Sequence, residues 1–181
     1  MKKAIHGLLI GVFSILFAGP VWAGQVSERP EGLLGLMSLL PMDDEFPGWK
    51  RSEKFLRASN EEELYRILNG GASLYIQHGF HSFVGQSFKG PKGAEVEVYI
   101  FDQGTAQMAE DLYENPYTKP SRMKEIPNLG EKGRIDMTPL FAYGVDFIQK
   151  GFFVRVMIQD KTDEGLNVAV SFARFISKRI K

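Results

Sequence analysis

A two-residue turn near the C-terminus constrains the fold more than any other feature of this sequence. Residues 140–149 and 152–159 are rich in β-branched and aromatic side chains, and only Lys150 and Gly151 separate them. Two strands joined by so short a turn must run antiparallel, because a parallel pair needs a crossover of roughly a dozen residues or more. The sequence therefore predicts an antiparallel hairpin in this part of the chain.

Further strand-like segments precede this hairpin. Residues 72–78 and 82–89 are apolar-rich runs joined by a short turn at Gly79, and a turn signal follows at Gly90-Pro91-Lys92-Gly93. In residues 95–101, Val96, Val98 and Ile100 recur at every second position, which is typical of a strand with one buried face. These three segments are expected to extend the antiparallel sheet.

Polar residues at the expected helix ends place three helices beside these strands. Ser59 and Glu62 have the spacing of a capping box, in which the hydroxyl and the carboxylate would each bond a backbone N–H group. Thr105 is expected to cap a second helix that ends at Glu114, and Thr162 a third helix near the C-terminus.

The order of these segments predicts an α+β fold, in which helices pack on a meandering antiparallel sheet. Residues 152–159 carry apolar side chains on both sides of the strand. Helices are therefore expected on both faces of the sheet, as in an αβα sandwich. Residues 116–139 are interrupted by prolines and are expected to be irregular.

Asn69, Gly70 and Gly71 follow the first expected helix and raise the question of a phosphate-binding loop. Phosphate-cradling glycines normally precede a helix, where the N-terminal dipole attracts an anion, whereas these residues come after one. Asparagine and glycine also tolerate the left-handed conformation that a helix end requires. The three residues are therefore predicted to stop the helix, with a positive φ in at least one of them.

The first 23 residues have the three-part pattern of a secretory signal peptide. Lys2 and Lys3 supply positive charge, an apolar stretch follows, and Val21-Trp22-Ala23 ends in a signal-peptidase pattern. Cleavage is expected before Gly24, which would place the protein in the periplasm or in the extracellular medium. The alternative is an uncleaved membrane anchor, but the apolar stretch is shorter than the roughly 20 residues that a span needs.

The remaining chain is expected to contain residues 24–51 as an irregular or briefly helical lead-in and residues 52–181 as a single α+β domain. Two of the 22 basic residues lie in the predicted signal peptide, which leaves 20 against 22 acidic residues. Nucleic acid is not expected as a partner, because it would require a basic face. The chain has no cysteine for a disulfide or a thiol nucleophile, and no later apolar run is long enough to span a membrane.

Several short motifs carry a resemblance to a known family. They are Pro47-Gly48-Trp49-Lys50, Glu63-Leu64-Tyr65, and a group of structural positions comprising Asn69, Gly70, Gly71, Ala72, Tyr75, Gly79 and Phe80. With these motifs the chain resembles DUF6599, an exported bacterial family, although Leu68 stands where that family often has isoleucine. The resemblance implies export and one α+β domain, and it carries no catalytic residue over. At the level of the fold, the order of elements is also similar to the PsbP and Mog1-like sandwich, whose members mostly bind partners.

Five side chains are candidates for a ligand-binding surface: His78, His81, Glu95, Glu97 and Arg155. The two histidines flank a turn, but a zinc site needs three or four ligands and no third ligand is apparent. Glu95 and Glu97 share one strand face, where a solvated or ion-paired surface is the alternative to an acid–base pair. Arg155 can pair across the sheet. No catalytic, cofactor-binding or metal-binding residue is assigned, and no cofactor is expected.

The sequence contains no catalytic triad, metal-ligand cluster or cofactor fingerprint. This favours a non-enzymatic domain that binds a protein of the cell envelope or a small ligand. The alternative is a periplasmic enzyme whose active-site residues are scattered along the chain. A concave pocket of convergent polar groups would favour the enzyme, and an open surface with exposed apolar side chains would favour binding.

Overall fold

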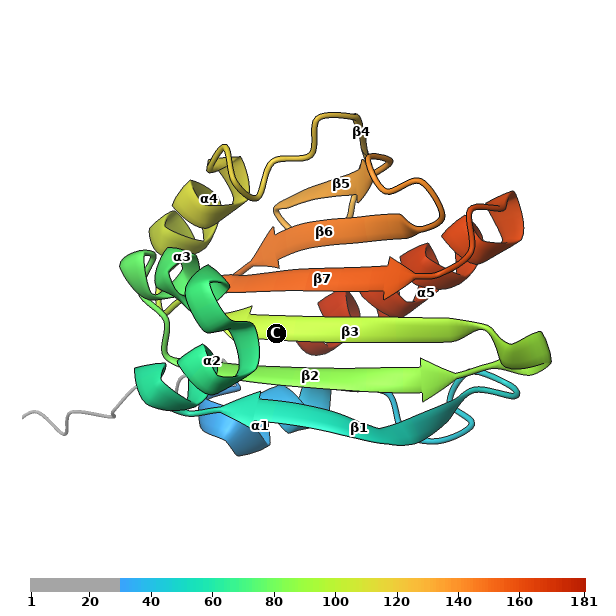
Figure 1. Ribbon diagram of the computed structural model, residues 1–181, viewed down its shortest axis with the longest axis horizontal. Coiled ribbons are helices and arrows are strands. Elements are labelled where there is room, and N and C mark those ends of the chain that lie inside the picture. The colour runs from blue at the N-terminus through green and yellow to red at the C-terminus, as the bar shows by residue number, and fades with distance from the viewer. Residues whose placement is uncertain (1–29) are drawn as a thin grey trace, which may run out of the picture.

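The computed structural model describes residues 30–181 (Figure 1). The predicted signal peptide and its cleavage site before Gly24 lie outside this range. Within it, seven strands form one antiparallel sheet in the order β1-β2-β3-β7-β6-β5-β4. Their bounds are Lys50–Ala58 (β1), Ser82–Lys89 (β2), Glu95–Asp102 (β3), Met123–Glu125 (β4), Lys132–Asp136 (β5), Tyr143–Gln149 (β6) and Phe152–Ile158 (β7).

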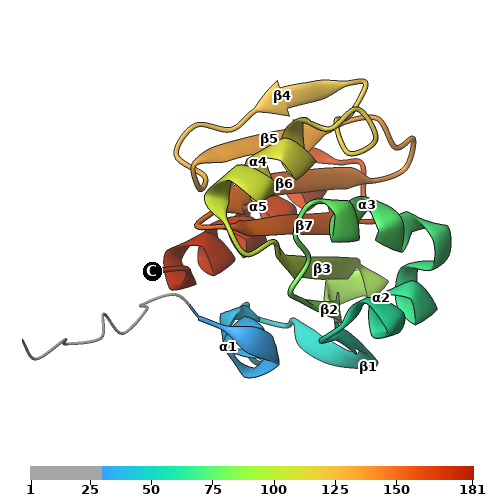
Figure 2. The same cartoon turned by 90° about the vertical axis from the view of Figure 1, so that its left-hand side faces the viewer.

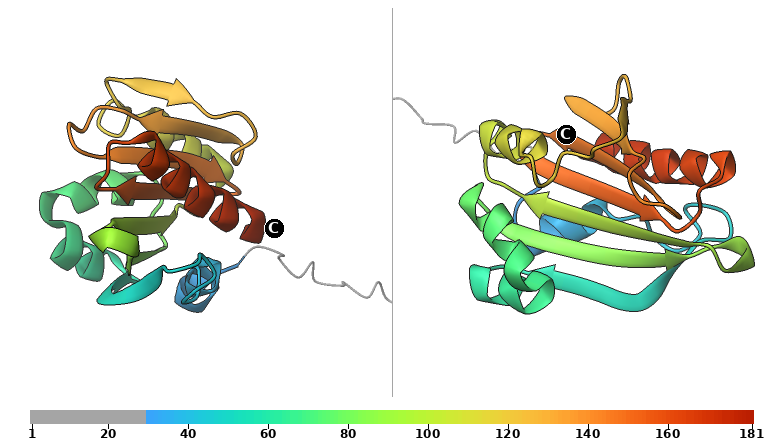
Figure 3. Two further views of the ribbon diagram at one scale, coloured as in Figure 1. Left: turned by 90° about the vertical axis from the view of Figure 1, so that its right-hand side faces the viewer. Right: turned by 45° about the horizontal axis from the view of Figure 1, so that its top comes forward.

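Helices pack on both faces of this sheet, so the fold is α+β in three layers. On one face lie α1 and α5, and on the other lie α2, α3 and α4, as Figures 2 and 3 show. The helices are Gly32–Leu39 (α1), Glu61–Leu68 (α2), Ala72–Gln77 (α3), Ala106–Glu114 (α4) and Asp163–Arg179 (α5).

The alternation of side chains along the central strands explains the two hydrophobic cores. In β3, Val96, Val98 and Ile100 point toward α1 and α5, where Leu36 and Phe172 complete the larger core. The opposite side of the same strands supplies a second, smaller core beneath the other helices, built around Phe83, Phe101, Phe153, Leu64, Ala72 and Leu112. A period of two in the strands therefore divides the sheet into two buried faces.

The predicted hairpin near the C-terminus is confirmed. β6 and β7 pair antiparallel across Lys150 and Gly151, whose φ angles are 49° and 81°. Two positive φ angles in a two-residue loop are the signature of a type I′ turn, whose twist matches that of the paired strands. The first of these strands begins at Tyr143, a little later than its pattern indicated.

The helix caps agree with the sequence in two of three cases. Thr105 and Thr162 each accept a hydrogen bond from a backbone N–H group in the first turn of α4 and α5. In α2, however, the N-cap is Asn60, and Glu63 rather than Glu62 reaches back to the N–H group of Ser59. The N-cap is therefore one residue later than predicted, and the carboxylate accepts from the residue before the N-cap instead of from the N-cap itself.

The expected strand at residues 72–78 is wrong, because this segment forms α3. Its apolar residues were too few to distinguish a strand from a short buried helix. In the structure Ala72 is buried in the smaller core, and the Tyr75 ring stacks on Phe101 with the centroids 3.9 Å apart. One helical turn thus brings both residues onto the sheet.

The turn between α2 and α3 places its strain at one residue. Asn69 has φ 50° and ψ −132°, which confirms a positive φ within the motif, while Gly71 has helical angles of −68° and −20°. Asn69–Gly71 form a short 3₁₀ turn that leads directly into α3. The motif therefore stops α2, but it redirects the chain into another helix rather than into a strand.

Two other expectations need correction. β1 begins at Lys50, so the expected boundary between lead-in and domain falls inside a strand. Residues 116–139 are not wholly irregular, because they contain β4 and β5. Both of these strands are short and carry charged side chains, and they lack the apolar alternation that marks longer strands.

Candidate functional site

The helices α2, α3 and α4 cover only one end of their face of the sheet (Figure 1). On the remaining part, Glu97 and Tyr99 of β3 lie beside Arg155 and Met157 of β7, because the register pairs Glu97 with Met157 and Tyr99 with Arg155. All four side chains are partly exposed. These four residues are called the uncovered face below.

A row of three charged residues crosses the sheet at Arg155. Arg134 of β5, Asp146 of β6 and Arg155 of β7 are successive partners in the register, so their side chains lie on the same face. Arg155 donates to both oxygens of Asp146, with Nε–Oδ1 at 2.7 Å and Nη2–Oδ2 at 2.8 Å. Arg134 Nε donates to the same carboxylate, 3.2 Å from Oδ2. These three residues are called the arginine row.

The inner end of the arginine row is fixed by its surroundings. Asp146 is fully buried and Arg134 is 1% exposed. The two remaining nitrogens of Arg134 donate to the carbonyl oxygens of Tyr113, at 2.7 Å, and Thr118, at 3.0 Å. Its guanidinium also lies 3.8 Å from the centre of the Tyr113 ring. A buried charge is tolerated only when an opposite charge and hydrogen bonds replace the water that it has lost.

The outer end of the arginine row reaches the solvent. The Arg155 side chain is 25% exposed, and Asp146 occupies only its Nε and Nη2 edge. The other edge, formed by N–H groups on Nη1 and Nη2, has no hydrogen-bond partner among residues 30–181. Tyr75 is near enough for the positive charge of Arg155 to act on its hydroxyl, although burial outweighs that charge and raises the pKa of Tyr75. The arginine is thus held rigidly while presenting a free donor edge.

A loop bonded to one lysine forms the far rim of the uncovered face. The loop at 137–142 joins β5 to β6 and projects on the same side of the sheet as α2 and α3 (Figures 2 and 3). Lys161 Nζ donates to the carbonyl oxygens of Met137, Pro139 and Ala142 at 3.1, 2.7 and 2.8 Å. This loop nevertheless exposes Leu140 and Phe141, each to 75% of its surface.

The structure separates the five predicted surface residues into two groups. Glu95, Glu97 and Arg155 share one face of the sheet, and Glu97 pairs with Lys54 at 2.5 Å. The Glu97 carboxylate is therefore ion-paired, as the alternative interpretation of this strand face expected.

The two histidines lie at the opposite end of the sheet. The Nδ1 atom of His78 is 2.7 Å from the carbonyl oxygen of Leu74, at the end of α3. His81 precedes β2 and is exposed. Nowhere in the described part of the chain do three His, Cys, Asp or Glu side chains gather closely enough to hold a metal ion.

A cavity of about 480 Å³ lies beside His81, and Ser82 and Asp102 contribute to its lining. The Ser82 hydroxyl is buried without a hydrogen-bond partner among the described residues. No hydrogen bond within residues 30–181 joins the His81 ring to this hydroxyl. An activated nucleophile normally has such a bond to its base, so the cavity lacks the geometry of a working serine–histidine pair.

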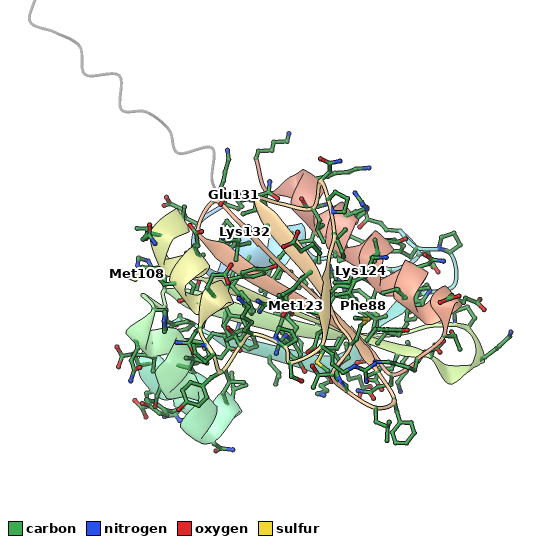
Figure 4. The ribbon with its side chains drawn as sticks, turned by 90° about the horizontal axis from the view of Figure 1, so that it is seen from above. Phe88, Met108, Met123, Lys124, Glu131 and Lys132 are labelled. Atoms are coloured by element: carbon green, nitrogen blue, oxygen red, sulfur yellow. The ribbon has the colours of Figure 1, made fainter. Side chains whose placement is uncertain are left out.

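A second cavity of about 380 Å³ lies between α4 and the β4–β5 segment, where Figure 4 shows Met123, Glu131 and Lys132. In its lining, Lys132 lies 3.1 Å from Glu114, and it also lies 2.7 Å from Glu110 of α4. Hydrogen bonds from Lys119 and Lys132 lower the pKa of Glu114. The basic side chains of this cavity, Lys119, Lys132 and Arg134, are thus already paired with carboxylates, so the uncovered face is the stronger candidate site.

Most of this site was not assigned from the sequence. Tyr99 shares the alternation of Glu95 and Glu97, so the period of two was a usable signal. Asp146 and Arg134 also carried a signal, because each stands beside apolar residues in the sequence. A charged residue that is buried among such neighbours is normally paired with an opposite charge. Their meeting with Arg155 depends on the register of three strands, which sequence spacing does not give.

Comparisons with known proteins extend this description at the level of the fold. No protein-family model matches the chain, and no curated protein sequence matches it. Among solved structures, the extracellular domain of PknH from Mycobacterium tuberculosis is similar, with a TM-score of 0.55 and 13% sequence identity. The similarity covers 84% of this chain and 98% of that domain. At this identity the two proteins share a fold, and no function follows from the match.

No helix within residues 30–181 is both long and apolar enough to cross a bilayer.

Proposed function

We propose that this protein is an exported, non-enzymatic module that binds a partner protein through the uncovered face and its rim. The observation that carries the proposal is the pair Leu140 and Phe141, which are 75% exposed on a loop that Lys161 holds in place. Large apolar side chains fixed in an exposed position are typical of the central contacts of protein interfaces.

Two further observations support this function. The uncovered face combines apolar and aromatic surface at Met157 and Tyr99 with the fixed donor edge of Arg155, and arginine and tyrosine are enriched among the residues that dominate binding energy. The similar solved structure is itself an extracellular domain, which agrees with the export that the N-terminal pattern predicts.

Site-specific photo-crosslinking in the producing cells tests the proposal. A benzophenone amino acid is introduced at Met157 or Leu140, and at the exposed Asn167 of α5 as the control on the opposite face. We expect one discrete crosslinked protein from the first two positions and none from Asn167. Absence of a crosslink at both Met157 and Leu140, or an equal pattern from all three positions, would refute binding through this face.

The cavity beside His81 favours an enzyme, because Ser82 lines it and the buried hydroxyl of Ser82 has no hydrogen-bond partner within residues 30–181. A fluorophosphonate probe, which reacts with activated serines, decides between the two functions. We expect no labelling of the native protein. Labelling that disappears in Ser82→Ala would establish a serine enzyme and displace the binding proposal.

A further inference from the structure

We infer that the free edge of Arg155 binds a carboxylate of the partner, supplied by an acidic side chain that lies next to an apolar one. This inference rests on the proposed function and adds the chemistry of the partner. It depends on the geometry of the guanidinium, on the charge of the arginine row and on the shape of the surface around it.

The geometry of Arg155 leaves a place for a second carboxylate. A guanidinium has two edges that can each donate a parallel pair of hydrogen bonds to a carboxylate. Asp146 accepts from the Nε and Nη2 edge at 2.7 and 2.8 Å. The Nη1 and Nη2 edge has no partner in the part of the chain that the structure describes. Since Asp146 already fixes the plane of the guanidinium, a ligand carboxylate would meet donors that need no reorientation.

The charge of the arginine row favours a single negative charge. Arg134 and Arg155 share one carboxylate, that of Asp146, and the other nitrogens of Arg134 donate to neutral carbonyl groups. Within the row, two arginines face one carboxylate in a largely buried setting, and Asp136 offsets part of the remaining positive charge. Asp136 is close enough to act on Arg155, and Glu97 lies on the same face but is paired with Lys54. These carboxylates would oppose a doubly charged phosphate more strongly than a carboxylate.

The surroundings of Arg155 favour an acidic residue of a protein over a small free acid. None of the cavities described above is lined by Arg155, so a small molecule would remain largely exposed there, whereas small-ligand sites bury most of their ligand. Met157 lies two residues from Arg155 on the same face of β7, and Leu140 and Phe141 on the rim add apolar surface on this side of the sheet. A partner segment with an acidic and an apolar side chain in succession matches both features.

A peptide pair tests this chemistry on the intact protein. The probes are a capped Leu-Glu-Phe peptide, its Leu-Gln-Phe analogue and inorganic phosphate, and the readout is the Nε–H resonance of Arg155 in a nitrogen-correlated NMR titration. We expect the glutamate peptide to shift this resonance and to bind at least about ten-fold more tightly than the glutamine peptide, because a charge-assisted bidentate contact is lost in the latter. Phosphate is expected to have little effect.

Arg155→Lys keeps the positive charge but lacks the second edge, so it should lose the preference for glutamate over glutamine. The matched control is Arg57→Lys, which changes an exposed arginine of β1 and should retain it. Equal binding of the two peptides to the native protein, no response of Arg155 to the glutamate peptide, or a stronger response to phosphate would each overturn the inference. The comparison of peptides on the native protein remains decisive even if Arg155→Lys does not fold.

The two proposals fail in distinguishable ways. If Met157 and Leu140 crosslink to a partner but the peptides show no preference for glutamate, the uncovered face binds a protein and the carboxylate inference is wrong. If the peptides show the preference but no partner is crosslinked at either position, Arg155 binds carboxylates while the proposed protein interface is wrong.

Discussion

At the scale of single residues, Asp146 is the residue on which the arginine row depends. It is fully buried and accepts three hydrogen bonds from two arginines on neighbouring strands. Replacing the carboxylate would leave two positive charges close together with no counter-charge between them, in surroundings that solvate them poorly. The residue therefore has a structural role, and the exposed edge of Arg155 depends on it for its orientation.

We predict that Asp146→Asn lowers the free energy of unfolding by about 3–5 kcal/mol, the range for breaking a buried ion pair by removing one partner. Asp111→Asn is the control, because Asp111 lies on the exposed surface of α4 and bonds only Gln107 among the described residues. Urea unfolding measures both. A loss for Asp146→Asn no larger than for the control would show that the row is not the charge network described here.

A second prediction concerns Tyr113, whose ring lies against Arg134. Burial raises the pKa of Tyr113 to about 12, although the charge of Arg134 acts in the opposite direction. A raised pKa in the folded state means that the neutral phenol contributes stability below pH about 10, and that this contribution is lost as the pH rises toward 12. An absorbance titration of tyrosine should show a step near pH 12 that Tyr113→Phe removes. Persistence of the full step in the variant would contradict the assignment.

At the scale of elements, the junction between α2 and α3 shows why the sequence predicted the end of a helix correctly and the next element wrongly. Asparagine followed by two glycines indicates a change of direction, and Asn69 does adopt a positive φ. Gly70 and Gly71 do not adopt a positive φ, and a Cβ atom at either position would meet open space. Neither position therefore requires glycine. The direction after the turn was set by the packing of Ala72 and Tyr75 on the sheet.

This assignment gives a prediction opposite to the one that the glycines suggest. Asn69→Val should destabilise the protein by about 1–3 kcal/mol, because a β-branched residue is strained at this φ. Asn69→Gly should be neutral or stabilising. Gly71→Ala should stabilise the folded protein by roughly 0.4–1 kcal/mol, because the backbone angles of Gly71 are helical and alanine reduces the conformational freedom of the unfolded chain. Thermal melts of the three variants measure these changes in stability. If Gly71→Ala alone lost stability, the backbone strain would lie at Gly71 and not at Asn69.

The loop at 137–142 leads to a prediction about its own rigidity. Lys161→Met removes the ammonium group that joins three carbonyl groups of the loop. Chymotrypsin should then cleave at Leu140 or Phe141 roughly three-fold faster or more, because local opening governs cleavage of an exposed loop. Lys178→Met, on the exposed surface of α5, is the control. Unchanged cleavage would mean that Lys161 does not hold the loop.

At the scale of the whole molecule, the parts of the fold that the sequence predicted are those set by local chemistry. The turn at Lys150 and Gly151, the caps at Thr105 and Thr162, and the alternation in β3 each depend on neighbours in the chain. The class of fold followed from their order.

The candidate site depends on partners that are far apart in the sequence. Arg134, Asp146 and Arg155 meet only because β5, β6 and β7 pair in one particular register. The short strands β4 and β5 were missed, and with them the position of Arg134. The loop that exposes Leu140 and Phe141 is bonded to Lys161, which lies beyond β7. The proposed binding function therefore depends on contacts that no local pattern in the sequence describes.

The central claim is that Leu140 and Phe141 serve binding and not folding, and the Leu140→Ser, Phe141→Ser double variant tests it most directly. Both side chains are 75% exposed, so their removal should change the free energy of unfolding by no more than about 0.5 kcal/mol. In the same variant, the crosslink formed by a benzophenone amino acid at Met157 should disappear. A crosslink of undiminished yield in the stable double variant would contradict the account.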